Sequence, residues 1–208
     1  MTKTRAVIKV PPPDAQCAIE ILLNAFAADP IARWMFPDDW DYRHGWGQLL
    51  GDFCAAALAT NSAYLTGDYA SGAALWHPLT AKPNNEATNK LMQELVASEK
   101  LTVFARVRER MKGFEPRDQH SCWYLATIGV DPGCQGTGMG SILLGHNLAE
   151  FDKRGLSTYL HSSNSVNIPF YQKFGFELLG EIQEGDAPPL FPMYRPGRGT
   201  TSTTQPVL

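Results

Sequence analysis

The chain has 208 residues, of which 44% are hydrophobic and 19% charged, so it can bury a substantial core but is short for two domains. Its formal net charge is −3, and no cluster of Lys or Arg provides the surface that nucleic-acid binding requires. The longest apolar stretch, residues 53–59, is far shorter than the roughly 18 residues of a membrane-spanning helix, and no signal peptide is recognisable. We therefore expect a cytoplasmic protein without a nucleic-acid or membrane partner.

The cysteines and histidines follow no metal-ligand spacing. The four cysteines contain no C-x-x-C pair, and none of the five histidines falls in an H-E-x-x-H motif. The cysteines are therefore interpreted as reduced thiols, and no metal site is expected.

The N-terminal half predicts alternating strands and helices. Asp14 can cap a helix with an apolar stripe that ends before Pro30, and Gly113 can end a long helix. In chain order we expect a strand at 6–10, that first helix, an aromatic and acidic loop at 29–41, a helix at 42–60, a hairpin of strands 63–66 and 72–77, and a helix throughout 86–112.

The C-terminal half gives a clearer pattern. We expect a strand at 122–130, a helix at 139–154 ended by Gly155, a strand at 156–161, a short helix at 168–174, and strands near 176–183 and 190–195. Residues 197–208 are of low complexity without an apolar stripe, which predicts a disordered tail after a single domain over 1–196.

A glycine-rich turn joins strand 122–130 to the following helix. Gly133, Gly136, Gly138 and Gly140 lie within eight positions, so the backbone can adopt positive φ angles and approach a ligand closely. Because a helix begins at once, the N–H groups of the turn and of the helix N-terminus point the same way. This arrangement predicts binding of a phosphate-bearing, nucleotide-like ligand.

Known phosphate-binding motifs narrow the ligand. An ATP-hydrolysing P-loop requires Lys and Ser/Thr after its last glycine, but Met139 and Gly140 follow Gly138. The dinucleotide motif G-x-G-x-x-G requires a third glycine where Ser141 stands, which disfavours a nicotinamide-dependent oxidoreductase. The motif Q-x-x-G-x-G, starting at Gln135, does fit.

Two motifs in this half resemble the signatures of the GNAT superfamily of N-acetyltransferases. The first is Q-x-x-G-x-G after Val130-Asp-Pro132, and the second extends from Asn164 to Phe176 and includes Tyr171, Gly175 and Phe176. The resemblance is close over 121–195 and loose over the first 80 residues. It implies an α+β fold, with a mixed, mostly antiparallel sheet of six or seven strands flanked by helices, in which strands 122–130 and 156–161 splay apart at the cofactor site.

The resemblance also implies the reaction. The chain is expected to transfer an acetyl group from acetyl-CoA to an amine by direct attack through a tetrahedral intermediate. The expected cofactor-binding residues are Ile128, Gly129, Val130, Gln135, Gly136, Thr137, Gly138, Met139, Gly140, Ser141, Asn167, Tyr171 and Lys173.

Candidate catalytic groups come from the same comparison. Tyr171 would protonate the departing CoA thiolate, because a phenol stays protonated at neutral pH, and Asn167 lies four residues earlier on the same helix face. A backbone N–H near Ile128 would stabilise the oxyanion. His120 is the first candidate for the general base, and Glu115 and Asp118 are less favoured candidates.

A second histidine has two open interpretations. His161 stands where GNAT relatives often carry Glu, which is consistent with a catalytic role. Its ring would then titrate near neutrality. The alternative is a structural histidine at the end of a strand.

The acceptor pocket is expected from the N-terminal half, where aromatic and acidic residues cluster. Phe26, Asp29, Trp34 and Tyr42 are the candidates, although packing of the linker onto the sheet is favoured for Trp34. A cationic or aryl small-molecule amine is favoured over a protein or peptide amine. A non-catalytic acyl-CoA sensor is the alternative from another class, and the chain is expected to be a monomer or homodimer.

Overall fold

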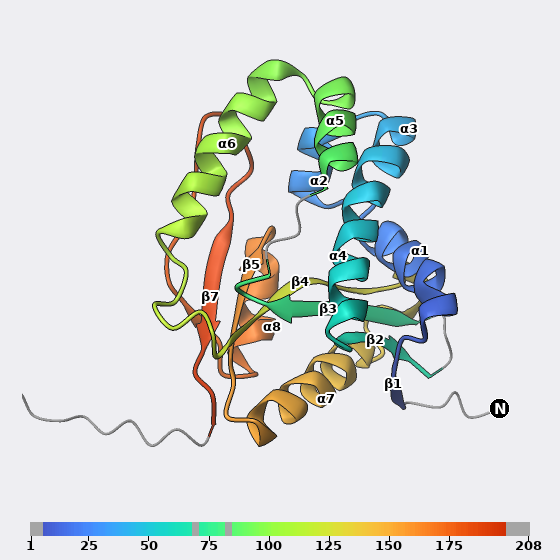
Figure 1. Cartoon of the computed structure of the whole chain (residues 1–208), viewed down its shortest axis with the longest axis vertical. Helices are drawn as coiled ribbons and strands as arrows, with labels where there is room; N and C mark the ends of the chain where they lie inside the picture. The colour runs from blue at the N-terminus through green and yellow to red at the C-terminus, as the bar shows by residue number, and fades with distance from the viewer. Residues whose placement is uncertain (1–5, 68–70, 82–84, 199–208) are drawn as a thin grey trace, which may run out of the picture.

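A central sheet with helices on both faces forms the protein (Figure 1). The computed structural model describes residues 6–67, 71–81 and 85–198. The strands of this sheet, in the order β1-β2-β3-β4-β5-β7-β6, are β1 (Val7–Lys9), β2 (Ala63–Thr66), β3 (Gly72–Pro78), β4 (Cys122–Val130), β5 (Ser157–Ser162), β6 (Glu177–Leu178) and β7 (Phe191–Arg195). All neighbouring pairs are antiparallel except β4 and β5, which are parallel. The expected mixed, mostly antiparallel sheet is confirmed.

The helices cover the two faces unequally. They are α1 (Ala15–Ala25), α2 (Pro30–Met35), α3 (Asp39–Asp41), α4 (Gly47–Ala59), α5 (Glu86–Leu95), α6 (Ser98–Lys112), α7 (Met139–Lys153) and α8 (Ile168–Gln172). In Figure 1, α1 and α4 lie on one side of β3 and α7 lies on the other, while α5 and α6 form an arch beyond α4. The sheet is therefore enclosed near its centre.

Side chains of β3 alternate between two hydrophobic cores, as the period of a strand requires. Ala73 and Leu75 pack into the core that contains α1 and α4, whereas Ala74 and Trp76 pack into the core that contains α7. The Trp76 indole N–H donates a hydrogen bond to Asn147 Oδ1 of α7 at 2.9 Å. This bond satisfies a polar atom that would otherwise be costly to bury.

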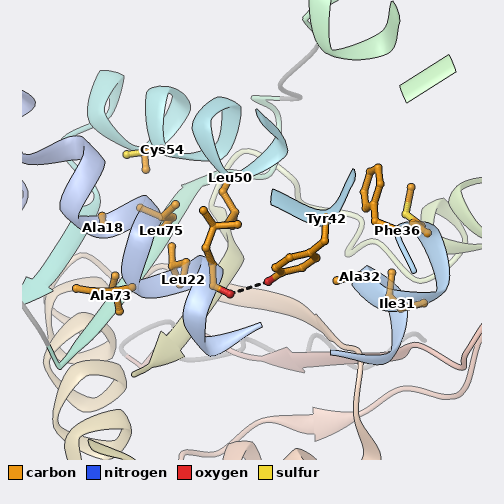
Figure 2. Close-up of a cluster of buried hydrophobic side chains, with 14 of the residues drawn as sticks. Ala18, Leu22, Ile31, Ala32, Phe36, Tyr42, Leu50, Cys54, Ala73 and Leu75 are labelled. Atoms are coloured by element: carbon orange, nitrogen blue, oxygen red, sulfur yellow. Dashed lines mark hydrogen bonds between the residues drawn. The ribbon is translucent and has the colours of Figure 1, made fainter. Parts of the chain in front are cut away.

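The larger core also fixes the segment between α2 and α4. Figure 2 shows Leu22 of α1, Leu50 of α4 and Leu75 of β3 together with Tyr42. The buried Tyr42 hydroxyl donates to the carbonyl of Leu23 at 2.7 Å. Tyr42 lies in a π-helical turn, residues 42–46, that precedes α4, so the helix expected over 42–60 begins irregularly.

The helix expected throughout residues 86–112 is wrong at its centre. Val96 and Ala97 have extended backbone angles, with ψ of 132° and 138°, and they separate α5 from α6. Val96 is 5% exposed and packs into the larger core. Burying this side chain turns the chain between the two helices, which an incomplete apolar stripe did not indicate.

The loop expected at 29–41 instead contains two short helices. Asp29 caps α2 by accepting the Ala32 N–H at 2.9 Å, and Pro30 occupies the first helical position. Asp38 caps α3 in the same way. An acidic residue before proline is a helix-start signal, and it was present in the sequence.

The remaining boundaries agree closely, with one further exception. Strand 122–130 has the predicted bounds, but the strand expected at 176–183 is reduced to β6 and one bridge between Ile182 and Leu190. Asp14 occupies the N-cap position of α1 without a side-chain capping bond. The disordered tail was expected at 197–208, and 199–208 lie outside the described residues.

Candidate active site

Strands β4 and β5 pair over only part of their length. Their parallel register ends where Leu125 lies opposite Leu160. Further along, the described partners of β4 lie on β3, and those of β5 lie on β7. Residues 125–130 of β4 consequently line a cleft between the two strands. The expected splayed pair is present.

A bulge accompanies this divergence. Trp76 of β3 lies opposite Leu125, but Leu75 lies opposite Thr127, so Ala126 is an extra residue in β4. An inserted residue bends a strand and increases its twist. The bulge therefore lies at the point where β4 leaves β5.

The glycine-rich turn forms one end of the cleft. Gly136 and Gly138 have φ angles of +73° and +85°, a region that other L-residues rarely adopt. Gly138 is the N-cap of α7, a helix of 15 residues, so its N–H groups and the positive end of its dipole face the turn. A Cβ built on Gly140 would lie 3.6 Å from Val130 Cγ2, so the helix start packs closely on β4.

Most of the predicted cofactor residues come together here. Those that line the cleft are Ile128, Gly129, Val130, Gln135, Gly136, Gly138, Met139, Gly140, Ser141, Asn167 and Tyr171. Thr137 and Lys173 do not line it: the Thr137 hydroxyl donates to the carbonyl of Cys134 at 2.6 Å, and Lys173 is exposed at the end of α8. The sequence interpretation missed Cys134 and Phe170, whose only signal was their position next to the two motifs.

Tyr171 lies at the other end of the cleft, on α8. It is 8% exposed, and its ring packs edge-on against Phe170 and Phe176. Burial, and secondarily the charge of Asp29, raise the pKa of Tyr171, so the phenol remains protonated at neutral pH. Within the described ranges its hydroxyl has no hydrogen-bond partner, so it can donate a proton to a ligand.

Asp29 contributes the one carboxylate among the described residues that line the cleft, and none of those residues is Lys or Arg. Its Oδ1 accepts the Ala32 N–H, and its Oδ2 accepts the hydroxyl of Ser163, which follows β5. Burial raises the pKa of Asp29, although the hydrogen bonds from Ser163, Ala32 and Ile31 oppose this shift. Asp29 is therefore the acidic side chain that this end of the cleft presents.

His161 lines the cleft between two tyrosines. Its Nδ1 is 3.1 Å from the Tyr124 hydroxyl and its Nε2 is 3.0 Å from the Tyr159 hydroxyl. Burial lowers the pKa of His161 to about 3, so the expectation that it titrates near neutrality is wrong. A neutral ring bonded at both nitrogens fits the structural interpretation.

His120, the predicted base, is not among the residues that line the cleft. It is exposed in the turn before β4, where its N–H donates to Asp118 Oδ1 at 3.2 Å. Glu115 accepts a hydrogen bond from the Gln119 side chain at 2.9 Å and likewise lies outside the lining. The structure thus separates these groups from Ile128 and Tyr171.

The predicted acceptor residues divide into two pairs. Phe26 and Asp29 line the cleft. Trp34 and Tyr42 do not: the Trp34 indole N–H donates to Asp186 at 3.1 Å, and Tyr42 bonds to Leu23. Ser163 also lines the cleft, although no sequence motif marked it.

The described residues contain no group of three or more His, Cys, Asp or Glu side chains placed to hold a metal ion. No helix within residues 6–67, 71–81 and 85–198 has the length and apolar character needed to cross a membrane.

Comparisons with known proteins identify the class. Residues 70–195 match the family model described as an acetyltransferase (GNAT) domain. Because this match covers more than half of the 208 residues, the chain belongs to the GNAT acetyltransferase family.

Solved structures of other acetyltransferases share the fold. A structure from Corynebacterium glutamicum, described as histone acetyltransferase HPA2 and related acetyltransferase, is 23% identical, with a TM-score of 0.66 over 94% of this chain and 98% of that one. Arylalkylamine N-acetyltransferase 2 from Aedes aegypti is 14% identical, with a TM-score of 0.62 over 91% and 96%. The PaiA N-acetyltransferase from Thermoplasma acidophilum, solved in complex with coenzyme A, is 14% identical, with a TM-score of 0.52 over 92% and 98%.

Proposed function

We propose that this protein transfers an acetyl group from acetyl-CoA to the amine of a small cationic molecule. The observation that carries the proposal is the cleft between β4 and β5, which has a glycine turn at one end and Asp29 with Tyr171 at the other. The glycine turn, the Tyr171 phenol and the Asp29 carboxyl line the same cleft, which supports a phosphate-binding backbone and a proton donor within one site. Membership of the GNAT acetyltransferase family supports the reaction class.

The described residues fit coenzyme A without a basic side chain. The turn at Gly136 and Gly138 and the N-terminus of α7 would bind the pyrophosphate through backbone N–H groups. The backbone groups of Ile128 and Val130 would form hydrogen bonds with the pantetheine arm, in the way that an added β-strand binds to the edge of a sheet. These groups are accessible because β4 and β5 no longer pair beyond Leu125. Asn167 lines the cleft beside this path.

Acetyl-CoA supplies an activated thioester, and the protein supplies an acid and an oxyanion donor. A backbone N–H near Ile128 would stabilise the negative charge on the carbonyl oxygen. Tyr171 would protonate the leaving sulfur, which its raised pKa and unpaired hydroxyl support.

The charge of the cleft favours a small amine. Structural neighbours include acetyltransferases named for small amines, agmatine and arylalkylamine, and others named for histone or ribosomal protein S18. These neighbours share the fold, so the acceptor has to be argued from this chain. Asp29 would attract an ammonium group, and the ring of Phe26 provides an aromatic surface for a cation.

Thermal unfolding with ligands tests the cofactor. A ligand at about 100 times its Kd stabilises by about 2.7 kcal/mol, a readily visible shift. We expect acetyl-CoA and CoA to raise the unfolding temperature, with NAD and ATP as matched negative controls. Failure of both CoA ligands would overturn the proposal, and a shift with NAD would favour an oxidoreductase.

A thiol assay for CoA release then separates enzyme from sensor. We expect CoA release to depend on an added primary amine such as agmatine or 2-phenylethylamine. Binding of CoA without release in the presence of any amine would favour the acyl-CoA sensor.

A further inference from the structure

Two segments far apart in the sequence form a hydrogen-bonded pair at the acceptor end of the cleft. Asp29 lies between α1 and α2, and Ser163 follows the last residue of β5. The Ser163 hydroxyl donates to Asp29 Oδ2, and both residues line the cleft together with Tyr171. The pair therefore faces the region in which an amine would meet the thioester.

The orientation of the carboxylate is fixed by two hydrogen bonds. Oδ1 accepts the Ala32 N–H at the start of α2, and Oδ2 accepts the serine hydroxyl. A carboxylate held in this way needs little reorganisation when a proton arrives, which favours proton transfer.

The Ser163 hydroxyl can still accept a hydrogen bond or a proton from a molecule in the cleft. A hydroxyl has one proton and two lone pairs, and Ser163 uses its proton toward Asp29. Because the residue also lines the cleft, its oxygen can accept a proton from a bound amine.

We propose that Ser163 and Asp29 form the proton acceptor of the acetyl transfer, with Ser163 in contact with the amine and Asp29 acting through it. This inference rests on the proposed function. It assigns the general base to Asp29, which lies in the loosely matching N-terminal region, and to Ser163, which directly precedes the motif that starts at Asn164. His120 has no part in the step.

The proton transfer balances. As the amine nitrogen forms a bond to the carbonyl carbon, its N–H proton moves to Ser163 Oγ, and the serine proton moves to Asp29 Oδ2. The C–S bond then breaks, its electron pair goes to sulfur, and Tyr171 donates a proton there. One proton has entered at Asp29 and one has left Tyr171, so one proton moving between them through solvent in the cleft resets the protein. An acceptor that arrives as an ammonium ion first loses one further proton to solvent.

Few other ionisable groups face the pair. Burial and then Asp29 raise the pKa of Tyr171 of α8. Burial also raises the pKa of Tyr42 in the π-helical turn, where Arg33 opposes the shift and Asp29 adds to it. His161 of β5 is neutral because burial lowers its pKa to about 3. Arg33 of α2 pairs with Asp39 at 2.8 Å and stacks on Tyr42. Asp29 is consequently the carboxylate in this set, and burial raises its pKa above the usual value, which favours proton uptake.

The test compares four variants with the wild type, using acetyl-CoA with agmatine and with 2-phenylethylamine. Ser163→Ala removes the contact but leaves the carboxylate charge, so we expect kcat to fall about 100-fold while the KM for the amine changes less than about threefold. Ser163→Thr keeps the hydroxyl and is expected to restore at least about a tenth of the wild-type kcat.

The other two variants separate charge from folding. Asp29→Asn keeps an N-cap for α2 but removes the charge, so kcat should fall and KM should rise about 10-fold or more. Asp38→Asn makes the same change at the cap of α3, outside the cleft, and should leave both constants unchanged. Acetyl-CoA affinity and unfolding temperature should be the same in all five proteins.

The outcomes are distinguishable. A loss of kcat in Ser163→Ala that Ser163→Thr repairs supports the relay. An unchanged kcat in Ser163→Ala overturns it, and so does an equal loss in the alanine and threonine variants, which would indicate packing. If the wild type binds CoA but releases none with either amine, the proposed function fails before the relay is tested.

Discussion

The two ends of the cleft are built from different kinds of atoms. At the proposed cofactor end, the cleft is formed mostly by backbone: a strand edge, a glycine turn and a helix start at Gly138. At the acceptor end they are side chains from distant segments, notably Asp29, Ser163 and Tyr171. Backbone sites depend on where glycines stand, whereas side-chain sites depend on how segments pack. This difference explains why one end is recognisable in the sequence and the other is not.

The largest expected effect comes from Tyr171, which lies with Asp29 and Ser163 in the cleft. Tyr171→Phe removes the acid but keeps the packing against Phe170 and Phe176, so kcat should fall about 10² to 10⁴-fold with CoA affinity unchanged. Steady-state kinetics and a CoA titration measure the two quantities. Tyr194→Phe, outside the cleft, is the control and should retain activity. Full activity in Tyr171→Phe would contradict the role of Tyr171 as the acid that protonates the CoA thiolate.

The second effect concerns the scaffold of the cofactor end. Arg195 of β7 is 3% exposed and makes two 2.7 Å bonds to Asp152 of α7, together with one to the Phe174 carbonyl at 2.9 Å. Arg195→Met removes the two short bonds to Asp152, which then keeps its contacts with Arg198. It also leaves the Phe174 carbonyl without this donor. The free energy of unfolding should fall by about 3 kcal/mol.

Denaturant titration checks this prediction against a matched change. Arg198 approaches the same Asp152 at 3.9 Å but is exposed, so Arg198→Met should change stability by less than about 0.5 kcal/mol. The hydrogen bonds from Arg195 lower the pKa of Asp152, so the stabilisation is present above the ordinary pKa of Asp, about 3.9, and is lost as the pH falls through the lowered value. An equal change in the free energy of unfolding for Arg195→Met and Arg198→Met would contradict the stabilising role of the buried Arg195–Asp152 pair.

Gly138 tests the backbone character of the turn. Its φ of +85° costs a residue with a Cβ roughly 1–2 kcal/mol, so Gly138→Ala should either destabilise by that amount or distort the turn and weaken CoA binding about 10-fold. Isothermal titration and denaturant unfolding distinguish these results. Gly51→Ala is the control, because no atom lies within 4 Å of its Cβ in helix α4, and it should be neutral or slightly stabilising. Normal binding and stability in Gly138→Ala would contradict a strained backbone site.

The last effect concerns His161 and appears only as the pH is lowered. Burial lowers its pKa to about 3, whereas the unfolded chain titrates near 6.5, so between these values the unfolded state binds a proton that the folded state does not. The free energy of unfolding should therefore fall as the pH drops below about 6.5, by up to about 1.4 kcal/mol per unit from this residue. His161→Gln should reduce that slope. His77, whose pKa burial also lowers, leaves a residual slope in both proteins. An equal slope in both would show that His161 is not buried as a neutral ring.

The cofactor end was predictable because its signals are local. The φ angles of Gly136 and Gly138 require glycine, and α7 starts directly after them, so the motif carries its own geometry. Strand β4 was predicted with its observed bounds for the same reason, since it alternates and ends at a proline turn.

The acceptor end was not predictable beyond Phe26 and Asp29. Ser163 meets Asp29 only because the fold brings the start of α2 next to the end of β5, and no spacing in the sequence encodes that contact. The break between α5 and α6 follows the burial of Val96, again a tertiary effect. Trp34 and Tyr42 are close to Asp29 in sequence, yet their side chains bond to Asp186 and Leu23 instead of facing the cleft.

The most direct test of the central claim is mass spectrometry of the wild-type reaction with acetyl-CoA and a small primary amine, combined with a thiol assay. We predict an N-acetylated amine that is about 42 Da heavier than the free amine, because an acetyl group replaces one hydrogen. Free CoA should form in an equal amount. Binding of CoA without acetylated product for agmatine, 2-phenylethylamine or other cationic amines would contradict the account.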